Sequence, residues 1–275
     1  MATTSIEWTD KVWNPVTGCT KVSQGCKHCY AETIANRFWG ERKFTDVRCH
    51  PERLEDPLKW RKPSRVFVNS MSDLFHPDVP LVFVAEVFQV MKMASLHTFQ
   101  ILTKRPDRML EFCKNWTILP NVWLGVSVED QRRANERIPL LLQTPAAVRF
   151  VSCEPLLEHV DIYQWLGGQR DIQPPHPYNG GLSWVICGGE SGPHARPMHP
   201  DWARSLRDQC VTVGVPFFFK QHGEWTTEYP QGLSMAHRKQ TYLNGQSYFR
   251  VGKKIAGRLL DGREWNEYPK EDRHD

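Results

Sequence analysis

The sequence has no long apolar run and no targeting signal. Its richest apolar stretch, residues 79–94, is interrupted by Glu86, Gln89 and Lys92. It therefore falls short of the ~20 apolar residues that a membrane-spanning helix needs. The N-terminus also lacks a basic region followed by an apolar one, which is the pattern of a secretory signal peptide. We expect a soluble cytoplasmic protein with no membrane partner and with cysteines in the reduced thiol form.

The chain also lacks low-complexity segments, internal repeats and a strong charge imbalance. Its 275 residues, of which 40% are hydrophobic, are enough for one large core or two small ones. The net charge of +4 permits a nucleic-acid partner but does not require one. Eleven tryptophans are more than a core usually requires. They either fill the core and its rim or line a cleft where they stack on bases.

Three of the cysteines form a compact group with the spacing C-x6-C-x2-C, at Cys19, Cys26 and Cys29. Cys26 and Cys29 can hold one metal centre within a single turn, and the loop before them lets Cys19 reach it. Three thiolates are one fewer than the four that close a structural zinc site or an ordinary iron–sulfur site, and no fourth ligand lies at finger-like spacing nearby. The spacing predicts a [4Fe–4S] cluster with one open iron, with zinc as the alternative metal.

The residues around these cysteines resemble the radical S-adenosylmethionine (SAM) superfamily. Cys26-x2-Cys29 followed by Tyr30 matches its motif, although the first gap has six residues in place of three. The whole chain is similar to a phage-associated, radical-SAM-like family with three cysteines. The segments that carry this wider likeness are Ile6-Glu7-Trp8-Thr9-Asp10, Leu102-Thr103-Lys104-Arg105-Pro106, Cys187-Gly188-Gly189-Glu190-Ser191-Gly192 and Leu260-Asp261-Gly262-Arg263.

The resemblance implies two cofactors and an electron donor. The cofactors are the [4Fe–4S] cluster and SAM, which binds the open iron through its amino and carboxylate groups. Reductive cleavage of SAM then gives a 5′-deoxyadenosyl radical that abstracts hydrogen from the substrate. The electron comes from a donor such as a flavodoxin or a ferredoxin.

Short apolar runs alternate with helical patterns along most of the chain. The runs, which we expect to be strands, are residues 65–69, 98–103, 122–128, 148–152, 184–187 and 215–220, with one more strand just before Cys19. The helical stretches are residues 80–95, 106–115, 130–142, 155–166 and 200–213. A further helix is predicted after Tyr30 from the apolar positions Ala31, Ile34, Ala35 and Phe38. This alternation predicts an α/β fold with a parallel sheet, in the form of a full or partial TIM-type barrel.

The predicted domains are a β/α barrel over residues 1–222, with the cluster loop at residues 18–30, and an extension over residues 223–275. An Asn-Gly turn at Asn244-Gly245 predicts a hairpin in the extension, which we expect to be small, β-rich and packed on the barrel. Residues 167–181 are rich in Gly, Pro and Gln and predict a long loop, possible roles of which include a lid or a binding loop.

Polar residues follow most of the predicted strands, at the end where such folds carry their chemistry. Single strand ends are often only solvent-exposed rim, but six in register with a cysteine loop favour a site. The candidate cofactor-binding residues are Tyr30, Ser70, Lys104, Ser127, Ser152, Glu154, Gly188, Gly189 and Glu190.

Five of these candidates have a specific chemical argument. Gly188-Gly189-Glu190 resembles the element by which radical SAM proteins hold the amino group of SAM, although it follows the sixth strand here and the second in the family. Glu154 is a competing carboxylate for that ammonium. Lys104, with Arg105 beside it, suits the carboxylate of SAM or a substrate phosphate. The alternatives are an exposed turn and solvated surface charges.

Cys153 lies at a strand end beside Glu154. Radical repair lyases use a cysteine to return a hydrogen atom to the product, so Cys153 is a candidate donor and Cys187 is second. The alternative is that both are small buried hydrophobic residues.

The function that the sequence predicts is therefore a radical SAM enzyme that acts on a nucleic-acid base, DNA being favoured, in repair or modification similar to that of a photoproduct lyase. One alternative keeps the radical chemistry and changes the substrate to a peptide or small metabolite. The other is a zinc-binding protein that binds nucleic acid without catalysis.

Overall fold

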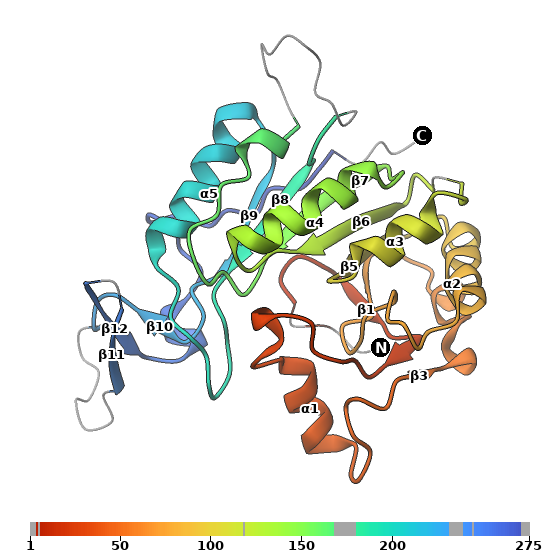
Figure 1. Ribbon diagram of the computed structural model, residues 1–275, viewed down its shortest axis with the longest axis horizontal. Coiled ribbons are helices and arrows are strands. Elements are labelled where there is room, and N and C mark those ends of the chain that lie inside the picture. The colour runs from red at the N-terminus through yellow and green to blue at the C-terminus, as the bar shows by residue number, and fades with distance from the viewer. Residues whose placement is uncertain are drawn as a thin grey trace.

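The computed structural model describes residues 4, 6–117, 119–167, 180–230, 239–243 and 245–270. Its centre is a parallel seven-stranded sheet with the order β1-β4-β5-β6-β7-β8-β9 (Figure 1). The strands are β1 (Lys11–Trp13), β4 (Arg65–Val68), β5 (Thr98–Thr103), β6 (Val122–Ser127), β7 (Val148–Cys153), β8 (Trp184–Gly188) and β9 (Phe217–Gln221). Among the described residues β1 and β9 do not pair with each other, so the sheet is open. The α/β class is confirmed with a sheet of the half-barrel kind, and a closed TIM barrel is not.

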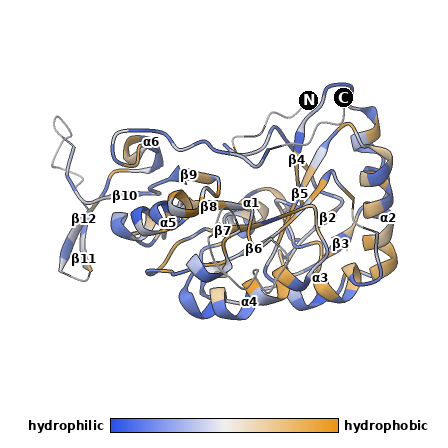
Figure 2. Cartoon of the chain, turned by 90° about the horizontal axis from the view of Figure 1, so that it is seen from above, coloured by the Kyte–Doolittle hydropathy of each residue, from blue (hydrophilic) through white to orange (hydrophobic). Residues whose placement is uncertain are grey.

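Four helices pack on one face of this sheet. They are α2 (Leu81–Met93), α3 (Pro106–Cys113), α4 (Gln131–Gln143) and α5 (Pro200–Val213). In Figure 2, α3 and α4 lie along the same side of the sheet, and each carries both blue and orange residues, as expected of helices that bury one face. The Asp130 side chain accepts from the backbone N–H of Arg133 at 2.7 Å and so caps α4. These helices confirm the predicted pattern.

The two faces of the sheet carry different side chains. Strand residues that alternate with one another point to opposite faces. One set, which includes Val66, Ile101 and Val151, joins the helices in the main core. The other set forms a separate cluster on what we call the aromatic face, with the members Trp8, Phe67, Trp123, Phe150, Trp184, Ile186 and Phe218.

One predicted helix is wrong. Residues 155–166 form no α-helix, and their only helical piece is the short 3-10 turn η4 (Tyr163–Trp165). The backbone N–H of Leu156 donates to Gly188 O at 3.0 Å, and that of Leu157 donates to Glu129 O at 2.9 Å. These bonds connect the segment to two neighbouring strand ends, and an α-helix would use such groups for bonds within itself.

The segment with the three cysteines leaves the sheet after β1. Strand β2 (Val16–Thr17) pairs antiparallel with β3 (Arg48–Cys49), and between them lie the 3-10 turn η1 (Gln24–Cys26) and α1 (Tyr30–Phe38). Cys29 is the N-cap of α1, so the predicted helix after the cysteines is confirmed. Two further 3-10 turns, η2 (Pro51–Arg53) and η3 (Asp56–Lys59), lead into β4.

The C-terminal part contains a three-stranded antiparallel sheet with the order β10-β12-β11. Its elements are β10 (Trp225–Thr226), β11 (Lys239–Leu243), β12 (Gln246–Arg250) and the short helix α6 (Lys253–Ala256). Leu243 pairs with Gln246, so the predicted hairpin is present, although Asn244 itself lies outside the described residues. Further on, Phe219 N–H donates to Trp265 O and Glu267 N–H to Phe217 O, so the end of the chain covers the outer edge of β9.

The remaining expectations concern the loop at residues 167–181, membrane-spanning helices and the domain division. Of the predicted loop at residues 167–181, positions 168–179 lie outside the described residues. In the described part of the chain, every helix is too short or too polar to cross a membrane. The division at residue 222 stays a prediction.

Candidate functional site

A cavity of about 130 Å³ lies at the carboxyl ends of β4, β5 and β6. Cys19, Cys26 and Cys29 all line it. The rest of the wall comes from the cysteine loop, the start of α1 and the three strand ends, namely Thr20, Val22, Tyr30, Ala31, Phe44, Phe67, Asn69, Ser70, Ser72, Asp73, Leu102, Thr103, Lys104, Arg105 and Ser127. The fold thus brings the three cysteines to the polar end of the sheet.

Two glycines let the cysteine loop follow its path. Gly18 has φ +93°, and a Cβ there would lie 2.5 Å from Asp46 O, so only glycine fits beside Cys19. The backbone N–H of Cys19 then donates to Phe44 O at 2.9 Å. Gly25 packs against Glu129, whose Cδ would be 3.0 Å from an added Cβ. The loop is therefore held close to the strand ends.

The donor set fits an iron–sulfur cluster. All three cysteines are free thiols of intermediate exposure on one cavity wall, and soft thiolate sulfur is the ligand that iron–sulfur clusters take. Burial raises the pKa of the Cys19 thiol to about 11, with a further increase from Asp73 and an opposing effect of Arg105. No three His, Cys, Asp or Glu side chains within the described ranges gather closely enough to hold a single metal ion.

A buried ion pair supports Cys19 from the end of β5. Arg105 Nη1 lies 2.9 Å from Asp73 Oδ2 and 3.6 Å from Cys19 Sγ. Arg105 Nη2 donates to Thr20 O at 3.0 Å. Asp73 in turn accepts from Thr103 Oγ1 at 2.7 Å and from Lys104 N–H at 3.1 Å. The guanidinium is therefore held in position between a carboxylate and the cysteine loop.

Two further side chains, Glu129 and Arg196, hold the same loop. Glu129, which follows β6, is fully buried and pairs with Arg137 at 2.8 Å. Its carboxylate also accepts from Gly25 N–H at 3.4 Å. Burial raises the pKa of Glu129, but Arg137 and hydrogen bonds from Ser23 and Gly25 outweigh this and lower it below its usual value. On the far side of the loop, Arg196 Nη2 donates to Gln24 O at 3.0 Å.

The cavity also contains polar groups that have no hydrogen-bond or ion-pair partner among the described residues. Asn69 is 2% exposed and has φ +64°, which is uncommon for a residue other than glycine. Its Oδ1 accepts from Val16 N–H at 3.1 Å, whereas its Nδ2 has no hydrogen-bond partner in the described structure. The Lys104 ammonium forms no ion pair with a described residue. A buried donor and a cation of this kind are available to a bound ligand.

Four of the predicted cofactor-binding residues line the cavity with the cysteines: Tyr30, Ser70, Lys104 and Ser127. Tyr30 connects the helix to the end of β4, because its hydroxyl donates to Ser70 O at 2.6 Å. The other five, Ser152, Glu154, Gly188, Gly189 and Glu190, do not line it.

The two predicted carboxylates are already paired. Glu154 Oε1 lies 2.7 Å from Lys220 Nζ. Glu190 binds Arg196 at 2.6 Å, and the same arginine contacts the cysteine loop. Glu190 is thus connected to the site through a cation of the protein itself.

Cys153 and Cys187 point away from the cavity. Both are fully buried in the main core on the helix-covered side of the sheet, while Phe67 of the cavity wall belongs to the aromatic face. Burial raises the pKa of Cys153 to about 12, with a smaller effect of Glu129. This position agrees with the alternative that these cysteines are small buried hydrophobic residues.

The tryptophans do not form a stacking surface at the site. All eleven lie in the described residues, where each is buried or half-buried, and none lines the cysteine cavity. Trp8, Trp123 and Trp184 fill the aromatic face instead. Of the two alternatives for the tryptophans, the described structure supports the one in which they fill the core and its rim.

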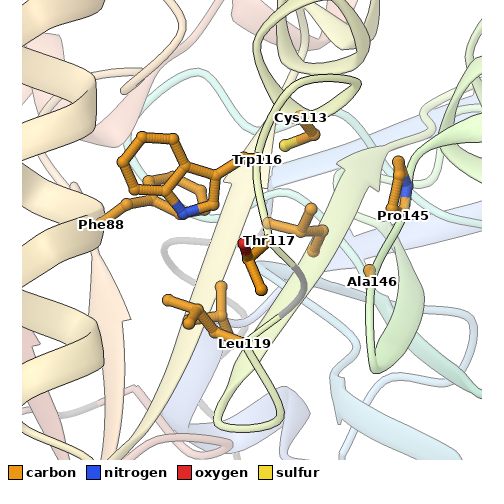
Figure 3. Close-up of a pocket in the computed structure, with 9 residues that line it drawn as sticks. Phe88, Cys113, Trp116, Thr117, Leu119, Pro145 and Ala146 are labelled. Carbon is orange, nitrogen blue, oxygen red and sulfur yellow. The ribbon is translucent and has the colours of Figure 1, made fainter.

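A second cavity, of about 10 Å³, lies between α2, α3 and β6 (Figure 3). Figure 3 shows Trp116 and Phe88 on one side of it and Pro145 and Ala146 on the other. Val122 and Leu124 of its wall belong to the first half of β6, at the opposite end from the cysteines. Its mostly apolar wall and small volume suit at most one water molecule.

Sequence reasoning missed the residues that support the cysteine loop. Asp73, Glu129 and Arg196 act through pairs with residues distant in sequence or in another loop. Asp73 and Glu129 were visible as polar residues after apolar runs, but nothing local shows what they contact. Arg196 had no signal in the sequence.

Comparison with known proteins gives a family and a set of distant structures. Residues 3–269 match the family described as "Protein of unknown function (DUF5131)". Among curated proteins, none matches the chain.

The similar solved structures are forms of spore photoproduct lyase. A cysteine-to-serine mutant is 12% identical with a TM-score of 0.45, covering 89% of this chain and 69% of that one. A double mutant with bound AdoMet and dinucleoside spore photoproduct is 13% identical with the same TM-score and coverage. A complex with dinucleoside spore photoproduct is 13% identical with a TM-score of 0.39, covering 88% and 68%. Because these values are low, we base the functional proposal on the residues of the site.

Proposed function

The chain belongs to the DUF5131 family, and we propose that it is a radical SAM enzyme whose Cys19, Cys26 and Cys29 hold a [4Fe–4S] cluster. One observation supports this most: the three cysteines of the C-x6-C-x2-C pattern line a single cavity with the polar ends of three parallel strands. Because the protein supplies only three ligands to the cluster, one of its irons would have an open coordination position for SAM.

The chemistry of the site is supplied in part by the two cofactors. When bound, the reduced cluster and SAM provide a 5′-deoxyadenosyl radical that abstracts hydrogen from a substrate. The protein binds and orients them. Lys104 carries the charge to pair with the carboxylate of SAM, and the free Nδ2 of Asn69 donates to an acceptor in the same cavity. Phe44 and Phe67 give the cavity an apolar wall that limits water.

The paired residues on the other half of the sheet have a supporting role in this proposal. Glu190 orients Arg196, which holds Gln24 and hence the cysteine loop. Glu154 and Lys220 form an ion pair beside Gly188. The proposal assigns no hydrogen-donating cysteine, since Cys153 lies on the helix-covered side of the sheet.

For the substrate we propose a base in a nucleic acid, with DNA favoured. The support is the excess of positive charge, with a sequence pI of about 8.6, and the unpaired Lys104 at the cavity. The reaction would be repair or modification of the base, similar to that of a photoproduct lyase. A peptide or a small metabolite is the substrate if nucleic acid does not bind.

Anaerobic reconstitution tests the cofactor part. We expect about four irons and four sulfides per chain, the composition of the cubane cluster. SAM should change the electron paramagnetic resonance (EPR) spectrum of the reduced cluster, and dithionite should then release 5′-deoxyadenosine. A colourless folded protein with stoichiometric zinc would end the proposal in favour of a zinc protein. A spectrum that saturating SAM leaves unchanged would exclude SAM as a ligand.

Titration with oligonucleotides tests the substrate part. Each phosphate that a cation neutralises should contribute roughly −0.7 to −0.9 to the slope of log affinity against log salt concentration. Damaged or single-stranded DNA should bind more tightly than intact duplex, because an unpaired base costs less to extrude. Affinity that is absent, or that does not depend on salt, would redirect the proposal to a peptide or metabolite.

A further inference from the structure

Helix α1 presents an apolar stripe to solvent. Tyr30, Ile34 and Phe38 are 47%, 41% and 69% exposed and follow one another at a spacing of four residues, which places them along one side of the helix. The opposite side is the one that packs, because Ala31 and Ala35 are buried against Phe44. The stripe is therefore not needed for the core.

This stripe begins at the cysteines. Cys29 is the N-cap of α1, and Tyr30 at its first position lines the cysteine cavity. The nine residues of α1 extend roughly 13 Å from that point. In Figure 1, α1 lies at the lower margin of the molecule, away from the helices that cover the sheet. A partner on the stripe would thus lie next to Cys26 and Cys29.

The surroundings of the stripe are positively charged. Residues 19–48 contain six Lys and Arg and three Asp and Glu, a net charge of +3, while the whole chain carries +4. Lys21 pairs with Glu32, and Arg42 and Arg48 pair with Asp46. The cations of this segment that form no ion pair with a described residue are Lys27, Arg37 and Lys43, against one such carboxylate, Glu41, and all four are exposed.

We propose that this α1 surface, made of Lys27, Tyr30, Ile34, Arg37, Phe38 and Lys43, docks an acidic one-electron carrier protein of the ferredoxin or flavodoxin type. The inference rests on the proposed function, because a [4Fe–4S] cluster that cleaves SAM needs an electron from outside. One electron passes from the reduced carrier, which is oxidised, to the cluster, which is reduced, and no covalent bond forms or breaks.

The composition of the surface favours a protein over a nucleic acid. Protein interfaces combine an apolar centre that includes aromatic side chains with a polar rim. The exposed Phe38 and Ile34 share α1 with Arg37, and the exposed Lys27 and Lys43 lie in the segments before and after this helix. A rim of one charge speeds the encounter with a partner of the opposite charge. Arg37 also stacks on the Phe38 ring at 5.2 Å, which holds one rim cation beside the apolar centre.

The reduction rate of the reconstituted protein tests the inference. Reduced flavodoxin, and ferredoxin in a parallel series, is mixed anaerobically with the cluster-loaded protein, and bleaching of the cluster is followed by stopped flow. Phe38→Ser and Ile34→Ser should slow this reduction at least about fivefold, since truncating an interface centre costs more than 1 kcal/mol. Arg37→Glu should slow it most at low salt.

Two controls separate docking from folding and from cluster loss. Val82→Ser on α2 removes an apolar side chain that is 68% exposed, nearly as much as Phe38, and should leave the rate unchanged. Dithionite needs no docking surface, so it should reduce every variant as fast as the wild type, with equal iron content. Arg37→Glu retains Phe38 and keeps the test valid if a serine variant fails to fold.

The outcomes are distinct. If no cluster forms, or dithionite cannot reduce it, the proposed function fails. If dithionite reduces the cluster but neither carrier does, or if the carriers reduce the variants as fast as the wild type, the docking inference is wrong and the cluster assignment stands. If Phe38→Ser and Arg37→Glu instead lose affinity for single-stranded DNA while carrier reduction is unchanged, the surface binds nucleic acid and the inference is overturned.

Discussion

The carboxyl ends of the sheet strands form one edge of the sheet, which has two halves: the ends of β4, β5 and β6, and the ends of β7 and β8. The two halves differ in whether their polar side chains have partners within the protein. After β4 and β6, Asp73 and Glu129 are also paired, with Arg105 and Arg137, but the cavity at this half holds two further groups. Asn69 Nδ2 has no hydrogen-bond partner and Lys104 has no ion pair among the described residues. After β7 and β8, the carboxylates already have cations of the protein, with Glu154 at 2.7 Å from Lys220 and Glu190 at 2.6 Å from Arg196.

This difference separates binding residues from supporting residues. In the sequence both halves look alike, since each has polar residues directly after an apolar run. A buried polar group that lacks a protein partner is costly unless a ligand or water satisfies it, whereas a paired carboxylate loses its partner when it binds a ligand. We therefore expect ligands at the first half and structural support from the second.

The largest effect should come from the cysteines. Cys19→Ala, Cys26→Ala or Cys29→Ala should abolish the cluster, because in the proposed function each removes one of the three protein ligands, all of which line the cavity. Cys153→Ala should retain it, since Cys153 lies in the helix-side core. Iron and sulfide analysis with EPR measures both. If the Cys26→Ala protein stayed brown and iron-loaded, the cofactor site would not lie at the first half of the carboxyl edge.

A large loss of stability should follow when the ion pair below the cavity is broken. Arg105→Gln leaves Asp73 as an unpaired buried carboxylate, which should lower the free energy of unfolding by about 3–5 kcal/mol. Urea unfolding of the metal-free protein gives this value. Arg132→Gln serves as the control, because Arg132 is 76% exposed in its pair with Glu136 and should change stability by at most about 1 kcal/mol.

The conservative variant sharpens that experiment. Arg105→Lys keeps the charge beside Asp73 but loses the second donor that reaches Thr20 O. It should recover part of the stability and still shift the reduction potential of the loaded protein, because a hydrogen bond toward Cys19 Sγ is lost. If the wild type, Arg105→Gln and Arg105→Lys had equal stability and equal reduction potential, the Arg105–Asp73 pair would not support the cysteine loop.

The fold was largely predictable from the sequence because its signals are local. The apolar run at 98–103 has the bounds of β5 and the helical stretch at 200–213 has those of α5, and the other sheet strands with predicted bounds agree within two residues. The helix at 155–166 was wrong because its periodicity carries no information about the bonds of Leu156 and Leu157 to other strand ends.

Of the site, only the grouping of the three cysteines was predictable from the sequence, because they lie close together in it. The three cysteines are close in sequence, so their spacing alone indicates a shared centre. Which strand ends join them depends on pairs across the fold, such as Asp73 with Arg105 and Glu190 with Arg196, which no local pattern reveals. Cys153 shows the same limit, because one position along a strand changes the face to which a side chain points.

SAM affinity should distinguish the two halves directly. Lys104→Ala removes the unpaired cation of the cavity and should raise the Kd for SAM about 10- to 100-fold, the value of a hydrogen bond to a charged group. Glu154→Ala should change that Kd less than about threefold, since its carboxylate is held by Lys220. Calorimetry on the reconstituted proteins measures both. A larger effect of Glu154→Ala would reverse the assignment of the two halves.

In their response to pH the two halves should behave alike, with the smallest effect. Burial lowers the pKa of His76, helped by Arg105 and Arg108 and opposed by Asp78 and Asp73. Burial also lowers that of His222, with Arg204 acting in the same direction and Leu259 O and Asp261 opposing. A histidine with a lowered folded-state pKa contributes stability above its unfolded pKa of about 6.5, and that stability is lost as the pH falls below it.

The free energy of unfolding should therefore be lower at about pH 5.5 than at about pH 7.5. Carboxylates are ionised at both pH values, so they do not account for the difference. His76→Gln and His222→Gln should each reduce this difference in urea unfolding. If only His76→Gln reduces it, the two halves differ in burial as well as in pairing.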